Sequence, residues 1–337
     1  MKVWKLAAAK NLTVLDEPAP ASTEGKIRVR VTKVLLTAAD AGVYTGAAKV
    51  RYPIVPGSFA VGIVADETGA ALFPKGARVL LHTFLPAPDG GTAKKDFSEP
   101  DMHIAGRTTD GYLKDFVYLS PSQMTPLPEA VSDEKALLIH HLALAKKTVD
   151  KLGAQKGDHV AVVGADILGV LVCQLLIYQQ TAPILIDASA ERLEFARRCG
   201  VYYTLPADEK LLDGVADMTG GNLAQGTVYL TSGAEANDTS IPFRITAHGR
   251  RVVVSGMYAE NLSFNVGLAL RKELSLHSVL GGKDYIEAAI NLLIGGAVDL
   301  SDYGIVGVRA ARIPAVFKTL SEDPLGKQDE INYVNLV

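Results

Sequence analysis

The chain has 337 residues, of which 48% are hydrophobic and 21% are charged, with 31 glycines and 16 prolines. This length exceeds what one ordinary domain core holds, so we expect a globular protein of two domains, or of one domain that interrupts another. The formal net charge of −3 provides no excess of positive charge for a polyanion, which excludes nucleic acid as an expected partner.

The first half of the chain has a pattern of short strands and turns. Residues 1–10 lack the apolar run of a secretory signal, which leads us to expect a cytoplasmic protein. Residues 26–31 alternate in polarity, and residues 57–64 and 77–81 are rich in strand-forming side chains beside Gly and Pro. Residues 85–109 are polar, rich in Pro and Gly and without periodicity, as expected of a surface excursion. This half therefore predicts an irregular β domain.

The second half alternates strands and helices. A helix is expected over 135–152, and strand-like and helical runs follow in turn from residue 158 onward. The expected strands are 159–164, 183–188, 227–232, 251–256 and 274–280. The expected helices are 167–180, 190–199, 236–247 and, farther on, 285–294. This alternation predicts a parallel sheet with helices on both faces.

Two features of the apolar segments limit the class of protein further. The longest apolar stretches, 136–145 and 159–177, are interrupted by His, Lys, Asp or Gly before they reach the roughly 20 residues of a membrane span, so we expect no membrane partner. Cys173 and Cys199 cannot form a disulfide framework. Because both lie at apolar positions of expected helices, we expect buried and inert thiols.

A glycine-spaced turn joins the expected strand 159–164 to the helix after it, in the sequence HVAVVGADILG (159–169). In a dinucleotide-binding turn the first Gly makes the tight turn, the second lets the pyrophosphate approach, and the third lets the helix pack on the strand. Gly164 and Gly169 hold the first and third positions, whereas Asp166 holds the second. The expected cofactor-binding residues here and in the segments that follow are Gly164, Asp166, Ile167, Leu168, Gly169, Asp187, Arg192 and Ser232.

An acidic residue ends the next expected strand, in the sequence ILID (184–187). Asp187 stands where such folds bind the ribose hydroxyls, and its charge repels a 2′-phosphate, so the sequence favours NAD over NADP. Asp166, in contrast, brings a carboxylate close to the pyrophosphate at a helix N-terminus that otherwise attracts anions. The alternative interpretation is a Rossmann-like scaffold whose dinucleotide site is empty or repurposed.

Further short motifs run along nearly the whole chain. They are TAAD (37–40), YTG (44–46), YPIVPG (52–57), GIV (62–64), PKGARV (74–79), GYLKDFV (111–117), GDHV (157–160) and MTGG (218–221). In this order, and with the dinucleotide turn among them, they resemble the medium-chain dehydrogenase/reductase superfamily, particularly its sorbitol, threonine and alcohol dehydrogenase branch.

The resemblance implies an α/β protein with two domains. A GroES-like, β-rich catalytic domain would be formed by residues 1–149 and 281–337, and a Rossmann-type domain with a doubly wound parallel sheet by residues 150–280. The active site would lie in the cleft, and NAD and a small-molecule substrate would be the partners. A homodimer or homotetramer is also implied, with the edge strand 274–280 as a candidate interface.

The zinc-ligand positions of that branch are occupied by other residues in this chain. Zinc members carry a Cys in a CGxD run, a His-Glu pair after a Gly, and a later Glu, Asp or Cys at the start of the linking helix. The matching positions hold Thr37, Ser58, Phe59 and His140, of which only His140 is a normal zinc ligand. The lobe that carries four structural-zinc cysteines corresponds to residues 81–111, which contain none. We therefore expect no metal site and zinc-independent chemistry.

Without zinc, another group must polarise the substrate carbonyl and exchange the proton that accompanies hydride transfer. His140, in the pair HH (140–141), is the best candidate, since His titrates near neutral pH and the resemblance places it in the cleft. The candidates for donating a hydrogen bond to a developing alkoxide, or for orienting such a donor, are Thr37, Ser58, Tyr44 and Asp40. The alternative is that His140 only fills a vacated ligand position, while Thr37 and Ser58 satisfy each other.

Three functions remain open from the sequence. The first is an NAD-dependent, zinc-independent oxidoreductase that acts on a small polar alcohol or carbonyl. The second is a metal-free reductase of a quinone or an activated C=C bond, in which conjugation stabilises the charge. The third is a non-catalytic Rossmann-fold binding protein that kept its fold after losing the metal.

Overall fold

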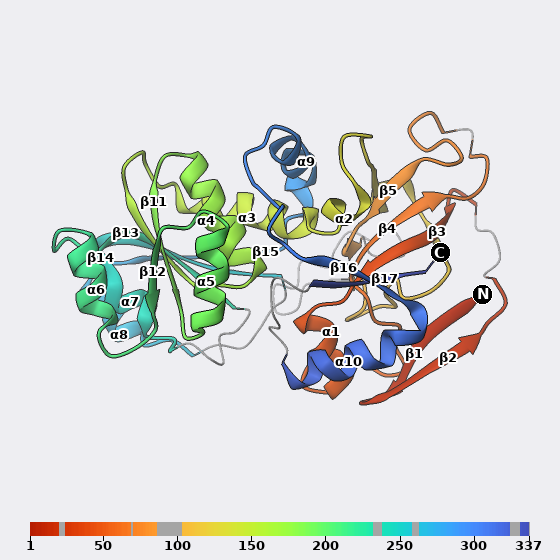
Figure 1. Ribbon diagram of the computed structural model, residues 1–337, viewed down its shortest axis with the longest axis horizontal. Coiled ribbons are helices and arrows are strands. Elements are labelled where there is room, and N and C mark those ends of the chain that lie inside the picture. Colours follow the sequence, from red (N-terminus) through yellow and green to blue (C-terminus); the bar gives the residue numbers. More distant parts are fainter. Residues whose placement is uncertain are drawn as a thin grey trace. The chain divides into compact units, whose positions relative to one another are not determined.

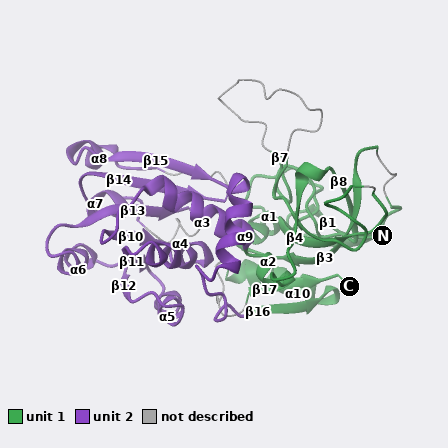
Figure 2. Cartoon of the chain, turned by 90° about the horizontal axis from the view of Figure 1, so that it is seen from above, with its two compact units in different colours: residues 1–138, 305–326, 330–337 green, residues 139–304, 327–329 purple. Residues whose placement is uncertain are grey.

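The computed structural model describes residues 1–19, 24–68, 70–85, 103–231, 238–257, 263–323 and 331–336. It separates into two compact units, coloured in Figure 2. Of the described residues, the first unit contains those within 1–138 together with 305–323 and 331–336, and the second contains those within 139–304. Each unit has its own sheet and its own core.

The first unit is built on a seven-stranded sheet in the order β16-β17-β3-β4-β5-β9, with β8 also paired to β3. All of its pairs are antiparallel except β16 with β17. Its strands are β3 (Ile27–Leu35), β4 (Phe59–Val64), β5 (Arg78–Leu81), β8 (Phe116–Leu119), β9 (Met124–Pro126), β16 (Ile305–Arg309) and β17 (Ile331–Asn335). Two smaller pairs are β1 (Lys2–Ala8) with β2 (Asn11–Asp16) and β6 (Phe84–Leu85) with β7 (His103–Ile104). The helices are α1 (Ala38–Thr45), α2 (Asp133–Ala136) and α10 (Ile313–Glu322), with short 3-10 turns at Pro121–Gln123 and Ala310–Arg312.

The core of the first unit joins both ends of the chain. In β3 the side chains of Ile27, Val29 and Val31 are buried while the residues between them are more exposed, which is the period-two pattern of a strand with one face on a core. From the C-terminal part, Phe317 of α10 is fully buried, and its ring lies 5.1 Å from the ring of Tyr44 in α1. The prediction of a β-rich first domain is confirmed.

The second unit is an open parallel sheet of six strands in the order β12-β11-β10-β13-β14-β15. Figure 1 shows this sheet, from green to light blue, with α4 and α5 among the helices packed around it. All five neighbouring pairs are parallel. The strands are β10 (His159–Val163), β11 (Ala182–Asp187), β12 (Tyr203–Pro206), β13 (Ala224–Leu230), β14 (Thr246–Gly256) and β15 (Ser275–Leu280). The helices are α3 (Ile139–Leu152), α4 (Ile167–Tyr178), α5 (Ala190–Arg198), α6 (Leu211–Met218), α7 (Ile241–Ile245), α8 (Val266–Arg271) and α9 (Ile286–Ile294), with a 3-10 turn at Lys283–Tyr285. The predicted Rossmann-type sheet is confirmed.

Helices cover both faces of this sheet. Ala161 and Val163 of β10 belong to a buried cluster with Leu211 of α6 and Ile241 of α7. The opposite face of β10 carries Val162, and α4 packs against β10 and β11 outside that cluster. This two-sided burial explains why the strands of the second unit are apolar along their whole length. None of the helices in the described ranges combines the length and the apolar character needed to cross a membrane.

The compact units divide at other residues than the domain limits 1–149, 150–280 and 281–337 taken from the resemblance. The helix α3 packs on α4, β13, β14 and β15, and α9 packs on α3, so both helices belong to the second unit by contact. The limits of the functional domains stay a prediction.

The helix expected over 236–247 is confirmed only at Ile241–Ile245 in the part that the structure describes. Only Ile241–Ile245 is helical, and β14 begins at Thr246. The carboxylate of Asp238 accepts hydrogen bonds from the amide and the hydroxyl of Ser240, which fixes a turn before the helix, and Pro242 stands in the first turn. These local hydrogen bonds therefore compete with helical ones just before Ile241.

Candidate functional site

The candidate site lies where the strand order in the sheet of the second unit reverses. From the central strand β10 the chain continues outward to β11 and β12, and then returns to the other side of β10 with β13. In open α/β sheets ligands bind outside the carboxyl ends of the strands at such a switch point. Gly164 directly follows β10, and Asp187 is the last residue of β11. The parallel pairing of Val163 with Ile186 brings these two residues to the same edge of the sheet.

Two glycines at this point allow α4 to start close to β10. Gly164 has a φ of +110°, which L side chains rarely adopt. A Cβ on Gly169 would lie 1.9 Å from the carbonyl oxygen of Gly164, which no side chain tolerates. The end of β13 also lies against this turn, since a Cβ on Gly164 would be 3.1 Å from Cβ of Leu230. The turn thus has the close backbone packing that the first and third glycines of the fingerprint require.

Asp187 is 2% exposed and already holds several hydrogen bonds within the chain. Its Oδ2 accepts from the amide of Ala165 at 2.8 Å, and its Oδ1 accepts from the amide of Ser189 at 2.8 Å and from the guanidinium of Arg192. A carboxylate offers about four acceptor positions, so about one remains for a ribose hydroxyl. The ion pair with Arg192 also offsets part of the negative charge that would repel a 2′-phosphate. The sequence did not indicate these internal partners.

Asp166 is the N-cap residue of α4 in the structure. Its Oδ1 accepts a hydrogen bond from the amide of Gly169 at 2.9 Å. The amides of Ile167 and Leu168 belong to the same first turn, where N–H groups have no acceptor within the helix. These amides are the donors that could bind a diphosphate next to the Asp166 carboxylate. Ser232, expected to contact the cofactor, lies outside the described residues.

The structure brings Thr37, Asp40 and the residue before Ser58 together in the first unit. Asp40 is 1% exposed, and its carboxylate accepts from the amide of Thr37 at 3.0 Å, the hydroxyl of Thr37 at 3.2 Å and the amide of Gly57 at 2.8 Å. Burial raises the pKa of the Asp40 carboxyl, while these hydrogen bonds act in the opposite direction. Asp40 thus ties the start of α1 to the turn before β4.

Ser58 and Tyr44 have structural contacts of their own. The buried hydroxyl of Ser58 donates to the carbonyl oxygen of Ala105 at 2.7 Å. Thr37 and Ser58 therefore do not satisfy each other, since each hydroxyl donates to a different group. Ala105 is fully buried although the sequence placed it in a surface excursion. The ring of Tyr44 packs against α10 and lines the core of the first unit.

His140 and His141 lie in the first turn of α3, in the second unit. His140 is 3% exposed. Burial, together with the neighbouring His140, lowers the pKa of His141 to about 3. An imidazole with so low a pKa is a weak base that does not hold a proton near pH 7, so of the two rings His140 remains the candidate for proton exchange.

The residues at the zinc-ligand positions do not fit a catalytic zinc ion. The hydroxyls of Thr37 and Ser58 donate to Asp40 and to Ala105, and Phe59 is a buried hydrocarbon ring. Zinc in proteins takes thiolate, imidazole or carboxylate ligands, and hydroxyls do not readily deprotonate to replace them. Within the described part of the chain, no three His, Cys, Asp or Glu side chains gather in a way that could hold a metal ion.

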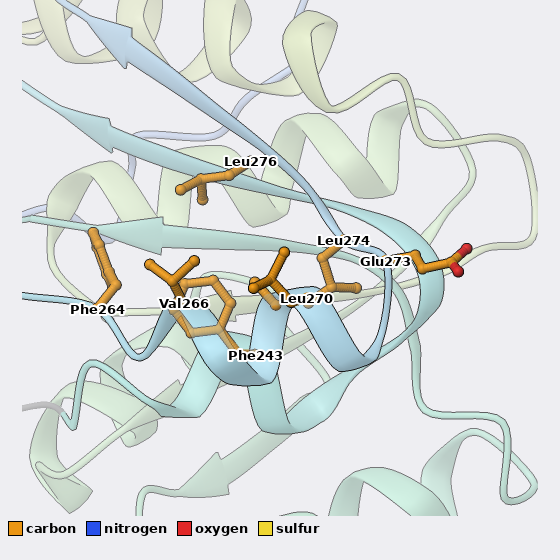
Figure 3. A pocket seen from close by; sticks show the side chains of 8 residues that line it. Phe243, Phe264, Val266, Leu270, Glu273, Leu274 and Leu276 are labelled. Atoms are coloured by element: carbon orange, nitrogen blue, oxygen red, sulfur yellow. The ribbon is translucent and has the colours of Figure 1, made fainter.

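A separate apolar pocket of about 290 Å³ lies beside α8 and the start of β15 (Figure 3). Its lining residues are Phe243, Phe264, Val266, Ala269, Leu270, Glu273, Leu274 and Leu276. The single charged side chain, Glu273, points away from the apolar group. Nothing in this lining would orient a polar substrate, so we do not assign the chemistry to it. From the sequence we expected only Leu274 and Leu276 of this lining to have a role, as part of the candidate edge-strand interface 274–280.

A Rossmann-type sheet with a glycine turn at its switch point, joined in one chain to a β-rich unit, defines a dehydrogenase-type architecture. The sequence model described as alcohol dehydrogenase GroES-like domain matches residues 23–129. The model described as zinc-binding dehydrogenase matches residues 168–294. The chain belongs to the medium-chain, zinc-type alcohol dehydrogenase family, and it is an alcohol dehydrogenase-like oxidoreductase dependent on a nicotinamide dinucleotide.

Several known proteins are similar to this chain over most of its length. An uncharacterized zinc-type alcohol dehydrogenase-like protein of Haemophilus influenzae is 22% identical over 96% of each chain. D-xylulose reductase A of Aspergillus niger is 27% identical over 77% of this chain and 75% of that protein. A crystal structure described as a short chain alcohol dehydrogenase from E. coli CFT073, complexed with NADH, superposes with a TM-score of 0.83 at 20% identity and covers 100% of this chain and 99% of the other.

Proposed function

We propose that this chain is an NAD(H)-dependent oxidoreductase that interconverts a small polar alcohol and its carbonyl compound without a catalytic zinc. The observation that carries the cofactor assignment is the geometry of the turn from Gly164 to Gly169, with Asp187 at the neighbouring strand end. The observation that carries the metal-free assignment is the set of residues that the resemblance matches to zinc ligands, where two hydroxyls and a phenyl ring stand in place of a thiolate, an imidazole and a carboxylate.

In this proposal the residues of the switch point hold the dinucleotide. The amides of Ile167 and Leu168 donate to the diphosphate at the start of α4, and the remaining acceptor position of Asp187 binds a ribose hydroxyl. Arg192 orients Asp187 through its ion pair. NAD is preferred over NADP because a buried carboxylate faces the ribose, although the ion pair makes that preference smaller than a lone Asp would give.

The chemistry needs a proton acceptor and a hydrogen-bond donor from the chain. A bound nicotinamide ring supplies the hydride acceptor for the substrate C–H bond. We assign to the imidazole of His140 the uptake of the proton from the alcohol O–H bond. The hydroxyl of Thr37, held by Asp40 through a long hydrogen bond of 3.2 Å, can redirect its proton toward the substrate oxygen. Ser58, which is committed to Ala105, and the core residue Tyr44 act in this proposal as supports of the first unit.

The substrate class in this proposal is a small polyol or its keto form. The name of the Aspergillus niger relative identifies it as a reductase of D-xylulose, a small polar ketone. A carbonyl of this kind lacks the conjugation that a quinone or an enoyl compound offers, so it depends on a proton donor such as His140.

The proposal is tested with metal-depleted protein. The chain is dialysed against a chelator, its zinc content is measured, and NADH and NADPH are titrated by calorimetry before polyols, sugars and quinones are screened for turnover. We expect NADH binding and polyol-dependent reduction of NAD that survive metal depletion. His140→Asn should lower turnover by about 10²- to 10⁴-fold with unchanged NADH affinity, while the exposed control His248→Asn should change neither. Activity that returns only when zinc is added refutes the metal-free proposal. A folded chain that binds neither NADH nor NADPH refutes the cofactor assignment and favours the non-catalytic binding protein.

We also propose that a second copy of the chain covers the edge strand β15, giving a homodimer or a tetramer built from such dimers. In the described residues β15 is paired on one side only, to β14. Three large apolar side chains are exposed at this edge, Leu276 of β15 and Val266 and Leu270 of the neighbouring α8 (Figure 3). Their exposed fractions are 49%, 59% and 73%. An unprotected apolar edge of this kind pairs readily with a like edge in a twofold arrangement.

The mass in solution tests this interface. Leu276→Lys should convert the assembly to a smaller species in light scattering after size-exclusion chromatography. Leu72→Lys, a control at a residue that is 71% exposed in the first unit, should leave the mass unchanged. A monomeric unaltered chain contradicts the proposal directly.

A further inference from the structure

A carboxylate of the chain itself, that of Asp166, lies at the N-terminus of α4. Asp166 has an extended backbone, with φ −81° and ψ −175°, and its Oδ1 accepts the amide hydrogen of Gly169 at 2.9 Å. Its carbonyl oxygen accepts from the amide of Val170 at 3.0 Å. The carboxylate therefore lies over the first turn of a twelve-residue helix, where the helix dipole and the uncommitted amides attract negative charge.

The same turn is the place for the diphosphate in the proposed function. Ala165 already donates its amide to Asp187, and Gly169 donates to Asp166, so two of the turn's amides are bound to carboxylates of the chain. Among the described hydrogen bonds, these two leave the amides of Ile167 and Leu168 in the first turn for a ligand. A diphosphate that binds them comes close to the Asp166 carboxylate in a partly buried setting, where like charges repel more than in water.

We infer that Asp166 is a specificity-determining residue of the dinucleotide site: its carboxylate competes with the ligand diphosphate for the N-terminus of α4 and weakens the binding of nucleoside diphosphate esters. This inference rests on the proposed function, since it concerns the same site. It adds that the chain itself limits cofactor affinity, and that the limit is electrostatic. Asn caps helices as well as Asp does, so Asn at this position keeps a capping oxygen for the amide of Gly169 while it removes the charge.

The test compares ligands with and without the diphosphate. ADP-ribose, NADH and adenosine are titrated by calorimetry into the unaltered chain, Asp166→Asn and a charge control, Asp158→Asn. Asp158 directly precedes β10 at the other end of the strand, and its carboxylate accepts from the amide of Gln155 at 2.7 Å, so the control removes one charge and preserves a similar turn. Thermal unfolding of each variant verifies that it is folded.

We expect Asp166→Asn to bind ADP-ribose and NADH about ten-fold more tightly at low ionic strength, with adenosine affinity unchanged. The gain should shrink when salt is raised to about 0.5 M, and Asp158→Asn should show no gain. Equal ADP-ribose affinity of the unaltered chain and Asp166→Asn overturns the inference and leaves the proposed function standing. A gain that extends equally to adenosine overturns it as well, because the effect is then not on the diphosphate. If no variant binds ADP-ribose or NADH, the proposed function and the inference both fail.

Discussion

Substituting Gly169 by Ala places one methyl group where the start of α4 meets the end of β10. The added Cβ would lie 1.9 Å from the carbonyl oxygen and 3.0 Å from the carbonyl carbon of Gly164, and 3.2 Å from Cδ1 of Leu230. Carbon and oxygen atoms in proteins approach to about 3.3 Å, so the overlap exceeds about 1 Å. The backbone at Gly164 is held by the bond from its amide to the carbonyl oxygen of Ile186, and the backbone at Gly169 is held by the bond from its amide to the carboxylate of Asp166, so neither segment can move freely.

The expected size of the effect follows from two opposing contributions. Forcing extra volume into a packed site costs about 3 kcal/mol at the upper end of the usual range, and the clash with backbone places Gly169→Ala at that end. Replacing Gly by Ala inside a helix returns about 1 kcal/mol. A net loss of about 2 kcal/mol lowers the melting temperature of a unit of this size by roughly 4 to 8 °C.

Thermal unfolding followed by circular dichroism measures this loss, with Gly267→Ala as the matched control. Gly267 also lies in a helix of the second unit, and its added Cβ would meet only the side-chain oxygen of Asn265, at 3.2 Å. The control should melt at the same temperature as the unaltered chain or slightly higher. If Gly169→Ala melts with the control, the close approach of α4 to β10 is refuted, together with the reason given for a glycine at this position.

Three further predictions concern pH and buried hydrogen bonds. Because burial lowers the pKa of His141 to about 3, the unfolded chain binds a proton on this ring more readily than the folded chain does. The contribution to stability is therefore fully present above about pH 6.5 and is lost as the pH falls toward 3. His141→Gln should reduce the change of the unfolding free energy with pH, measured by urea titration between about pH 7.5 and 5.5, and an unchanged slope contradicts the assignment. Burial raises the pKa of the Asp133 carboxyl, but the hydrogen bonds and charges of Lys33 and Arg78 hold that pKa below its usual value. The ionised carboxylate therefore stabilises the fold above about pH 4, and this stabilisation is lost on further acidification. Asp133→Asn should melt at a lower temperature than the unaltered chain at pH 7 and differ less from it below about pH 3, whereas a constant difference refutes the ion pair. Ser58→Ala leaves the buried carbonyl oxygen of Ala105 without its hydroxyl donor and should reduce the unfolding free energy by about 1 to 3 kcal/mol in urea titration, and a neutral result would remove the structural role of that hydroxyl.

Features that depend on neighbouring residues could be predicted from the sequence. The period-two alternation from residue 26 and the regular exchange of strands and helices after 158 follow from which side chains must be buried, and both were confirmed. The turn from Gly164 to Gly169 was recognisable because glycine spacing records where backbone must approach backbone. The helix expected over 236–247 failed where a local turn at Asp238 competed with helical hydrogen bonds.

The tertiary structure decided the partners of the polar residues in the candidate site. Ser58 was expected to face a substrate or Thr37, but its hydroxyl donates to Ala105, which the fold brings from 47 residues farther along the chain. Asp187 likewise binds the amide of Ala165, 22 residues before it, because parallel pairing aligns the ends of β10 and β11. The sequence alone determined that a dinucleotide turn is present, because such a turn depends on residue identity and short spacing, whereas the replacement of the zinc ligands stays a prediction from the resemblance. Which oxygen accepts which proton depends on strand order and register, and these are properties of the folded chain that no short stretch of sequence contains.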